Sequence, residues 1–527
     1  MMHRVFSACP QGVSAVPITV EADVRVGGST RVSIVGLPDT ATRESKDRLI
    51  PAITNSGFAL ESGTIIINLS PADLPKEGMA YDLPMAVAIL AARQIIPSER
   101  VEGLLLLGEL ALDGTVRPVP SVLASAECAR EQGIDTLIVP KGNGQEAYLV
   151  EGLTIYEVAH LKELVKFLRG REAWEPFTCD RQVLFTDQGE YEAPDLRDVR
   201  GQANVKRVLE IAAAGHHNLL LFGPPGSGKS MLSKRLPGIM PPMRPEEIIE
   251  VTRIYSASGR LRGGGSALVR RPFRAPHHTA SPIAMIGGGA YPKPGEVTRA
   301  HRGVLFLDEF PEFPRSVLEV LRQPLEDRQV TISRASQQVT FPADFLLVAA
   351  MNPCPCGWRG DRRRPCRCTE PRIQQYRARL SGPLLDRIDL HVEVPSLAIS
   401  TIRKLPPAET SERVRQRVLA ARAIQTDRYG SSLLTNASMP PSYLEKYCPI
   451  DDELARLLEE KVEACGYSKR VHDKVIRVAR TIADLAGSPQ ISADHLLESL
   501  AYRQLDVQTV GVIVPPKTAT QVPEVMP

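Results

Sequence analysis

A glycine-rich loop that directly follows a short apolar run constrains the fold of this chain more than any other feature. Residues 219–222 are Leu-Leu-Leu-Phe, which is typical of a buried strand, and residues 223–230 read Gly-Pro-Pro-Gly-Ser-Gly-Lys-Ser. The glycines allow successive backbone N–H groups of the loop to point at phosphate oxygens, and a helix is expected to follow the loop. The predicted nucleotide-binding residues are Gly223, Pro224, Pro225, Gly226, Ser227, Gly228, Lys229 and Ser230.

The side chains of this loop and of a second strand end have separate expected roles. Lys229 supplies a positive charge to the β and γ phosphates of ATP, and Ser230 supplies a hydroxyl to Mg²⁺. Residues 304–307 are another buried-strand run, which ends in Asp308 and Glu309. We expect Asp308 to hold Mg²⁺ and Glu309 to orient and polarise the attacking water. The alternative is that Asp308 only caps a helix.

Two further polar residues follow or precede predicted strands. The strand expected over residues 345–350 is followed by Met351 and Asn352, whose amide can hydrogen-bond the γ phosphate or the water. Arg387 lies between a turn and another strand. Its alternative role is a surface salt bridge with Asp386 or Asp389.

The order of these motifs resembles the AAA+ ATPases of the helix-two-insert group, which includes the magnesium chelatase ATPase subunit and the minichromosome-maintenance helicases. The resemblance implies that Asn352 is sensor 1 and that Arg387 is an arginine finger acting on the ATP of a neighbouring subunit. It also implies that Arg470 is sensor 2, with Arg477 as the weaker candidate. An arginine finger that acts on a neighbour implies a ring, expected to be a hexamer.

Two segments are expected to be insertions in this ATPase. His277 and His278 should point in opposite directions on an extended chain and form hydrogen bonds rather than bind metal. Residues 330–341 have a hairpin pattern, and their place before the third strand resembles the pre-sensor-1 hairpin of the group. Arg334 near its tip would contact DNA phosphates, unless this is a plain surface hairpin.

Four of the nine cysteines are grouped, as two Cys-x-Cys pairs. Four thiolates at this spacing can close on Zn²⁺, and the alternative is free or redox-active thiols. Eight arginines between residues 359 and 379 would make the segment basic, which suits nucleic acid nearby. The grouped cysteines are Cys354, Cys356, Cys366 and Cys368.

The chain has 527 residues, too many for one hydrophobic core, and we predict a multidomain α/β protein. The first domain is expected over residues 1–168. Within it, residues 75–86 (Pro-Lys-Glu-Gly-Met-Ala-Tyr-Asp-Leu-Pro-Met-Ala) and 108–119 (Gly-Glu-Leu-Ala-Leu-Asp-Gly-Thr-Val-Arg-Pro-Val) resemble the proteolytic domain of Lon proteases. The resemblance places the nucleophilic Ser on Ala80 and its Lys on Leu123, so no protease activity is expected. We expect the remaining parts to be a linker (169–195), the ATPase core with its inserts and Cys-rich knuckle (196–395), a helical lid (396–506) and a disordered tail (507–527).

In combination, these features resemble the YifB/ComM family, whose members are often labelled magnesium chelatase-like. The resemblance implies a hexameric helicase that drives branch migration during natural transformation, with ATP, Mg²⁺ and single-stranded or branched DNA as ligands. A protein-remodelling ATPase is the second alternative, for which Phe273 and Tyr291 are the candidate pore aromatics, and a metal-inserting chelatase motor is the third. Without a long apolar run or a signal peptide, we expect a cytoplasmic protein with no membrane partner.

Overall fold

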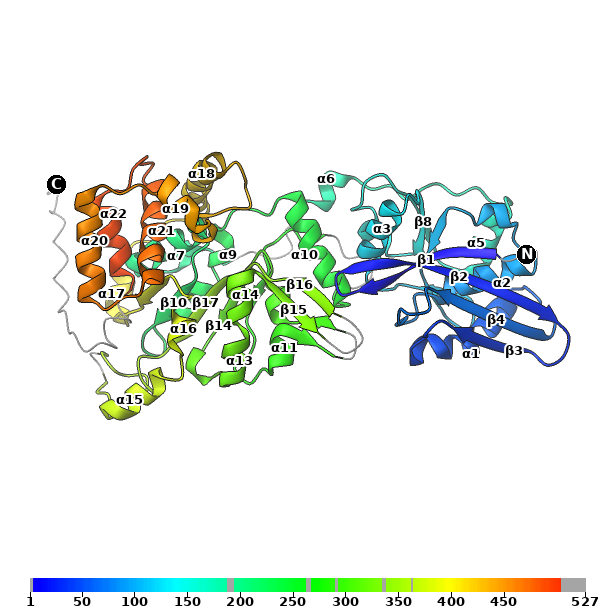
Figure 1. Cartoon of the computed structure of the whole chain (residues 1–527), viewed down its shortest axis with the longest axis horizontal. Helices are drawn as coiled ribbons and strands as arrows, with labels where there is room; N and C mark the ends of the chain where they lie inside the picture. Colours follow the sequence, from blue (N-terminus) through cyan, green and yellow to red (C-terminus); the bar gives the residue numbers. More distant parts are fainter. Residues whose placement is uncertain are drawn as a thin grey trace.

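The computed structural model describes residues 3–186, 194–261, 267–289, 292–333, 338–361 and 364–503. Three parts follow one another along the long axis of the molecule: a sheet domain, a second sheet domain and a helical region (Figure 1). The predicted multidomain α/β fold with a helical C-terminal region is confirmed. The predicted tail (507–527), Tyr291 and Arg334 lie outside the described residues.

The first domain is built on a mixed seven-stranded sheet with the order β3-β4-β2-β1-β5-β8-β9. Strands β1 and β2 form a long antiparallel hairpin, whereas β5, β8 and β9 are parallel. The strands are β1 (His3–Gln11), β2 (Ser14–Val26), β3 (Arg31–Val35), β4 (Gly63–Ser70), β5 (Leu104–Leu106), β8 (Thr136–Pro140) and β9 (Thr154–Val158), with a small ribbon of β6 (Glu109–Leu110) and β7 (Val116–Arg117). The helices are α1 (Thr40–Asn55), α2 (Asp82–Ala92), η1 (Ser98–Arg100), α3 (Val122–Glu131), α4 (Gly144–Ala147) and α5 (Leu161–Leu168).

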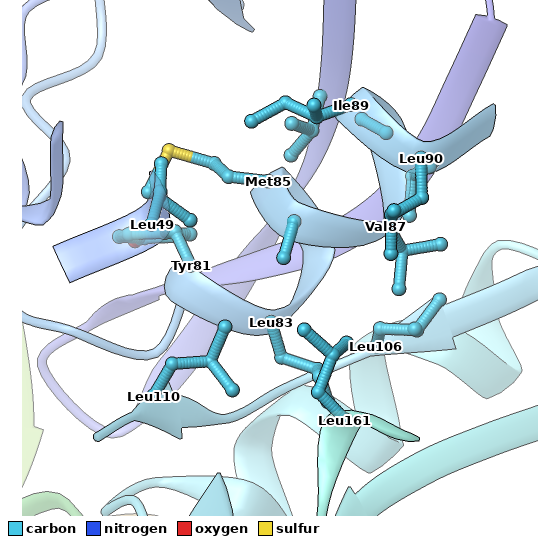
Figure 2. Packing of buried hydrophobic residues seen from close by; sticks show 14 of the residues in the cluster. Leu49, Tyr81, Leu83, Met85, Val87, Ile89, Leu90, Leu106, Leu110 and Leu161 are labelled. Carbon is cyan, nitrogen blue, oxygen red and sulfur yellow. The ribbon is translucent and has the colours of Figure 1, made fainter. Parts of the chain in front are cut away.

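Helix α2 lies at the centre of this domain and is buried on all sides. Its side chains Leu83 and Met85 belong to one buried cluster with Leu49 of α1 and Leu106 of β5, as Figure 2 shows. A helix that is apolar around its whole circumference must be enclosed by other elements. Its one acidic residue, Asp82, accepts hydrogen bonds from Ser45 and from Arg48 (Nε–Oδ2, 3.1 Å). Burial raises the pKa of Asp82, and these partners oppose that rise.

The second sheet is parallel and has the order β11-β14-β17-β10-β18. Its central strands are buried along their whole length, as expected for a parallel sheet covered on both faces. Because the strands are parallel, the residues that follow β10, β14 and β17 meet at one edge. The strands are β11 (Phe273–Arg274), β14 (Val304–Leu307), β17 (Leu346–Met351), β10 (Leu219–Phe222) and β18 (Leu390–Glu393).

Short helices and hairpins surround this sheet. The helices are η2 (Leu196–Asp198), α7 (Ala203–Gly215), α8 (Lys229–Ser233), α9 (Leu236–Ile239), α10 (Pro245–Ala257), α11 (Pro282–Ile286), α12 (Glu296–Arg299), η3 (Phe310–Glu312), α13 (Arg315–Val320), α14 (Arg322–Asp327), α15 (Glu370–Arg377) and α16 (Gly382–Leu385). The hairpins are β12 (Gly287–Gly288) with β13 (Lys293–Pro294), and β15 (Gln329–Ser333) with β16 (Gln338–Pro342). The hairpin over residues 330–341 was therefore predicted correctly, whereas helix α10 was not predicted from the sequence.

The C-terminal region consists of helices, and α18 and α21 pack against α7 of the second domain. Helix α21 presents an apolar stripe to a small core of its own, which includes Val471, Val475 and Leu458. The helices are α17 (Ile399–Lys404), α18 (Ser411–Tyr429), η4 (Asn436–Ser438), α19 (Pro441–Tyr447), α20 (Asp452–Ala464), α21 (Lys469–Leu485) and α22 (Ala493–Ala501).

The two sheet domains share apolar packing. Leu123 of α3 and Ile248 of α10 belong to one buried cluster, and Leu184 of α6 (Arg181–Leu184), which lies in the predicted linker, joins the same cluster. At a second contact, the turn between β1 and β2 touches the β15–β16 hairpin. Gly12, at φ +65°, lies so close to Val339 that a Cβ atom at this position would collide with the valine side chain.

Within the described part of the chain, no helix has both the length and the apolar run that crossing a membrane requires.

Candidate nucleotide-binding site

The glycine-rich loop runs from the end of β10 to the start of α8. Gly226 and Gly228 have φ values of +74° and +98°, which L side chains rarely adopt, and this explains the glycines at these two positions. Lys229 is 8% exposed, and its Nζ donates hydrogen bonds to the carbonyl oxygens of Gly223 (2.7 Å) and Pro224 (3.0 Å). The loop therefore holds the lysine ammonium group in place through its own backbone.

Asn352 lies beside the same ammonium group. Its Oδ1 is 3.3 Å from the Nζ of Lys229, although 123 residues separate the two in the chain. Burial lowers the pKa of Lys229, and the nearby charge of Asp308 opposes this shift. The structure thus brings together the lysine and the asparagine that the sequence had placed at two separate strand ends.

The acidic pair after β14 lies at the same edge of the sheet. Ser230 donates a hydrogen bond from its Oγ to Oδ2 of Asp308 over 2.6 Å. A hydroxyl and a carboxylate at this separation can both contribute oxygen ligands to one Mg²⁺ ion, which prefers such ligands. Glu309 follows with a left-handed backbone (φ +52°), and its side chain is half exposed.

Sequence reasoning missed one partner of Glu309. Nδ1 of His278, from the segment after β11, lies 3.0 Å from Oε2 of Glu309. The rings of His277 and His278 pack together with their centroids 4.1 Å apart, so the expectation that they point in opposite directions was wrong. The expected hydrogen bonding is present, because Nδ1 of His277 lies 2.9 Å from Oγ1 of Thr279. The two adjacent histidines were the only hint of this contact in the local sequence. They did not identify Glu309 as the partner, because it lies in a different segment of the chain.

The predicted arginine finger and sensor 2 lie elsewhere. Arg387 and Arg470 line a cleft of about 470 Å³ that also includes Asn218 and Phe345. Asn218 and Phe345 precede β10 and β17, so this cleft lies at the edge of the sheet opposite the glycine-rich loop. In a single chain, therefore, neither arginine belongs to the group formed by Lys229 and its neighbours.

The cleft contains guanidinium groups with unused donors. Arg387 pairs with Glu326 (Nη2–Oε2, 2.6 Å) and not with Asp386 or Asp389, the partners considered from the sequence. The Nε atoms of Arg387 and Arg477 are both buried and, among the described residues, have no hydrogen-bond acceptor. Unpaired buried donors of this kind are costly.

Asp389 and Lys474 also line this cleft and lie beside each other. Nζ of Lys474 lies 2.6 Å from Oδ1 of Asp389. Burial opposes ionisation of Asp389, but Lys474 and His217 outweigh it and hold the pKa of this carboxyl well below its usual range. Asp389 therefore forms its ion pair with Lys474, whereas Arg387 pairs with Glu326.

Two other predicted contact residues have different outcomes. Phe273 packs against Phe306 with ring centroids 5.9 Å apart and is therefore a packing residue rather than an exposed pore aromatic. Arg334, which was expected near the tip of the hairpin, lies outside the described residues.

The four grouped cysteines lie together directly after Asn352, and we call this segment the cysteine knuckle (Cys354, Cys356, Cys366 and Cys368). The sulfur atoms all lie within 4.8 Å of one another. Among the flanking arginines, Arg359 pairs with Glu370 (2.9 Å) and Arg364 stacks over Trp358 (4.6 Å to the ring centre), while Arg362 and Arg363 lie outside the described residues.

Apolar side chains occupy the two positions of the first domain at which the expected likeness to Lon proteases would need a nucleophile and a base. Leu123 is fully buried, and Ala80 packs against the same cluster. Neither side chain can act as nucleophile or base. The backbone N–H of Leu123 donates to Oε1 of Glu146 (2.9 Å), and the same carboxylate accepts a hydrogen bond from Ser256 of α10. The position thus serves as a joint between the two sheet domains.

Comparison with known proteins agrees with this geometry. The profile "Magnesium chelatase, subunit ChlI" matches residues 195–402, "Subunit ChlI of Mg-chelatase" matches residues 20–143, and "Magnesium chelatase, subunit ChlI C-terminal" matches residues 408–503. The YifB protein of Salmonella typhimurium is 44% identical over 510 residues, which cover 94% of this chain and 96% of YifB.

Two further relatives were found. Competence protein ComM of Haemophilus influenzae is 42% identical over 512 residues, which cover 95% of this chain and 97% of ComM. Lon protease 2 of Bacillus subtilis is 27% identical over 182 residues, which cover 30% of this chain and 33% of that protease.

Proposed function

Because the chain belongs to the YifB/ComM family of magnesium chelatase-like proteins, we propose that it is an ATP-hydrolysing ring motor that acts on DNA. In this proposal it is a helicase that promotes branch migration when homologous strands are exchanged during natural transformation. The observation that carries the proposal is that two groups of residues expected to act on ATP lie far apart in one chain. The glycine-rich loop lies at one edge of the second sheet, and Arg387 lies in a cleft at the opposite edge.

The family indicates ATPase activity with ATP and Mg²⁺, and the side chains of the nucleotide site have the corresponding chemistry. When ATP binds, Lys229 is in place to exchange carbonyl oxygens of its own loop for phosphate oxygens. Ser230 and Asp308 would hold Mg²⁺, which neutralises developing charge on the phosphates. Glu309 would accept a proton from the attacking water while Asn352 orients it.

The position of the cleft supports a ring. Arg387 cannot serve the phosphates of its own chain from the opposite edge of the sheet, but it can serve those of a neighbour docked against that edge. Arginine supplied by a neighbouring subunit stabilises charge in the transition state of phosphoryl transfer. The presence of Arg387, Arg470 and Arg477 in the same cleft supports this assignment.

DNA is proposed as the substrate for two reasons. The relative from Haemophilus influenzae carries the name competence protein, and the β15–β16 hairpin precedes the strand that ends at Asn352. A hairpin connected to that strand can move when the nucleotide site changes. Backbone-phosphate contacts at its tip would grip a strand without reading its sequence. Peptide hydrolysis is not part of the proposal, because Ala80 and Leu123 stand where a protease needs its nucleophile and base.

The first experiment is ATP hydrolysis by the purified full-length protein without DNA, with single-stranded DNA and with a branched junction, using Glu309→Gln as the inactive control. We expect turnover that rises with DNA and disappears in the variant. Branch migration of a labelled junction should then depend on ATP. Glu309-dependent hydrolysis that ignores every DNA offered would reject the DNA motor and favour a protein-remodelling ATPase. Hydrolysis stimulated only by a metal-insertion partner would favour the chelatase-type motor.

The ring is tested by mixing two inactive variants. Lys229→Ala disables the nucleotide loop but retains the arginine cleft, whereas Arg387→Ala does the reverse. If the arginine acts on a neighbour, mixing the two proteins creates interfaces with one intact loop and one intact arginine, and part of the activity returns. If both act within one chain, no mixture recovers activity.

A further inference from the structure

We propose that the cysteine knuckle binds one structural zinc ion, and that the zinc-bound knuckle holds Asn352 and the glycine-rich loop in register at the nucleotide site. The zinc site is independent of the proposed function. The effect on the nucleotide site rests on the ATPase part of that proposal.

The spacing of the sulfur atoms carries the metal assignment. Sγ of Cys354 lies 3.4 Å from that of Cys356 and 3.6 Å from that of Cys366, and Cys356 and Cys366 are also 3.6 Å apart. A disulfide would require about 2.0 Å. Four sulfurs bound to one zinc ion at about 2.3 Å lie about 3.8 Å apart when the geometry is tetrahedral. The observed spacing therefore fits a closed four-thiolate site and does not fit two disulfides.

The backbone around the knuckle also suits metal-bound thiolates. The backbone N–H of Cys368 donates to Sγ of Cys366 over 3.4 Å. Hydrogen bonds of this kind orient metal ligands and spread their negative charge. Cys354 is buried and the other three are partly exposed, so an ion can reach the site from solvent. Zinc is the ion that four-cysteine structural sites of this kind usually hold.

The knuckle is in direct contact with the nucleotide loop. Only Pro353 separates Cys354 from Asn352, whose amide oxygen faces Lys229. Gly357, in the turn after the second cysteine, lies against Pro225: a Cβ atom at this position would be 2.7 Å from the Cδ and Cγ atoms of the proline ring. The turn therefore packs backbone to ring on the glycine-rich loop. A metal ion that fixes the turn fixes this contact as well.

Metal content of the purified full-length protein is the first test. We expect one zinc per chain by elemental analysis. After substitution with Co²⁺, the protein should show the ligand-to-metal charge-transfer bands and the d–d bands of a tetrahedral cobalt thiolate centre. Cys356→Ser and Cys368→Ser should lose the metal, and Cys465→Ser, a partly exposed cysteine outside the knuckle, should retain it. Thiol titration that finds disulfides, or protein that neither contains nor takes up zinc or cobalt, would overturn the site. This outcome does not depend on whether the protein acts on DNA.

A pair of glycine variants tests the effect on the nucleotide site. Gly357 and Gly360 both have φ +81°, so alanine is equally strained at both, but a Cβ atom at Gly360 would meet nothing within 4 Å. Gly357→Ala should retain one zinc and lose about tenfold or more in ATP turnover, because small displacements of catalytic groups are expensive. Gly360→Ala should retain zinc and change turnover by less than about twofold. Equal effects of the two variants would show that the contact with Pro225 does not position the site.

Discussion

The two sheet domains of this protein place very different residues where chemistry would occur. At the edge of the second sheet, Lys229 lies within hydrogen-bonding distance of Asn352, and Asp308 accepts a hydrogen bond from Ser230. In the first domain, Ala80 and Leu123, where the expected likeness to Lon proteases would need a nucleophile and a base, are closed by apolar packing. The comparison teaches that two α/β domains of one chain can use such a position differently, the second for polar groups and the first for packing against its neighbour.

The largest expected effect concerns the polar site. Lys229→Ala should reduce ATP turnover by about 10³-fold or more, because the lysine provides the positive charge nearest to the phosphates. Lys234→Ala, at an exposed lysine just beyond α8, is the matched control and should leave turnover within about twofold. Steady-state hydrolysis and nucleotide affinity measure both. Substantial activity in Lys229→Ala would mean that another group neutralises the phosphates.

The apolar site should respond through stability instead. Leu123→Lys places an unpaired charge in a fully buried position and should lower the free energy of unfolding by about 3 kcal/mol or more. Leu112→Lys, at a leucine that is 54% exposed in the same domain, should change it by less than about 0.5 kcal/mol. Chemical denaturation followed by circular dichroism separates the two. If Leu123→Lys were as stable as the wild type, the position would still have room and polarity for a catalytic lysine.

A smaller effect is expected at the joint between the domains. Ser256→Ala removes the hydrogen bond that α10 donates to the buried carboxylate of Glu146. This loss should lower the free energy of unfolding by about 1–2 kcal/mol. Ser258→Ala is the control, because its hydroxyl only donates to Tyr255 of its own helix. Hydrogen exchange at α3 and α10 should increase in the first variant alone. Unchanged protection in Ser256→Ala would show that apolar packing by itself joins the domains.

No gain of activity is expected from restoring one catalytic residue. Ala80→Ser supplies a hydroxyl but leaves Leu123 beside it, so the serine has no base to take its proton. Peptide and casein hydrolysis by this variant should stay at the wild-type background, and ATP turnover should be unchanged. Measurable ATP-dependent proteolysis would show that the protease-like domain retains its machinery.

Much of the second domain could be predicted from local sequence. Buried runs such as residues 304–307 and the loop with Lys229 have signatures within a few neighbouring residues, and parallel strands bring their ends to one edge. Helix α10 is regular but was not predicted, because the prolines and glycines on either side of it made the helical spacing of its apolar residues hard to recognise. The pattern of an insertion therefore hid a helix that carries an interdomain contact.

The remaining features depend on contacts between distant parts of the sequence. The bond between Ser256 and Glu146 spans 110 residues, and His278 reaches Glu309 from another segment. The local sequence of either partner carries no trace of the other, since a hydrogen bond only requires that the fold bring the two together. The separation of Arg387 from the nucleotide loop likewise emerges only from the direction of the strands.

The close contact at Gly12 has a mechanical consequence. Strands β1 and β2 form a continuous hairpin that reaches from the first sheet to the β15–β16 hairpin, and at their meeting point Gly12 leaves no free space beside Val339. Two bodies in contact without a gap cannot approach further, so a displacement of the β15–β16 hairpin toward the first domain pushes on the β1–β2 hairpin with no slack. The first domain therefore resists any displacement of the β15–β16 hairpin toward it.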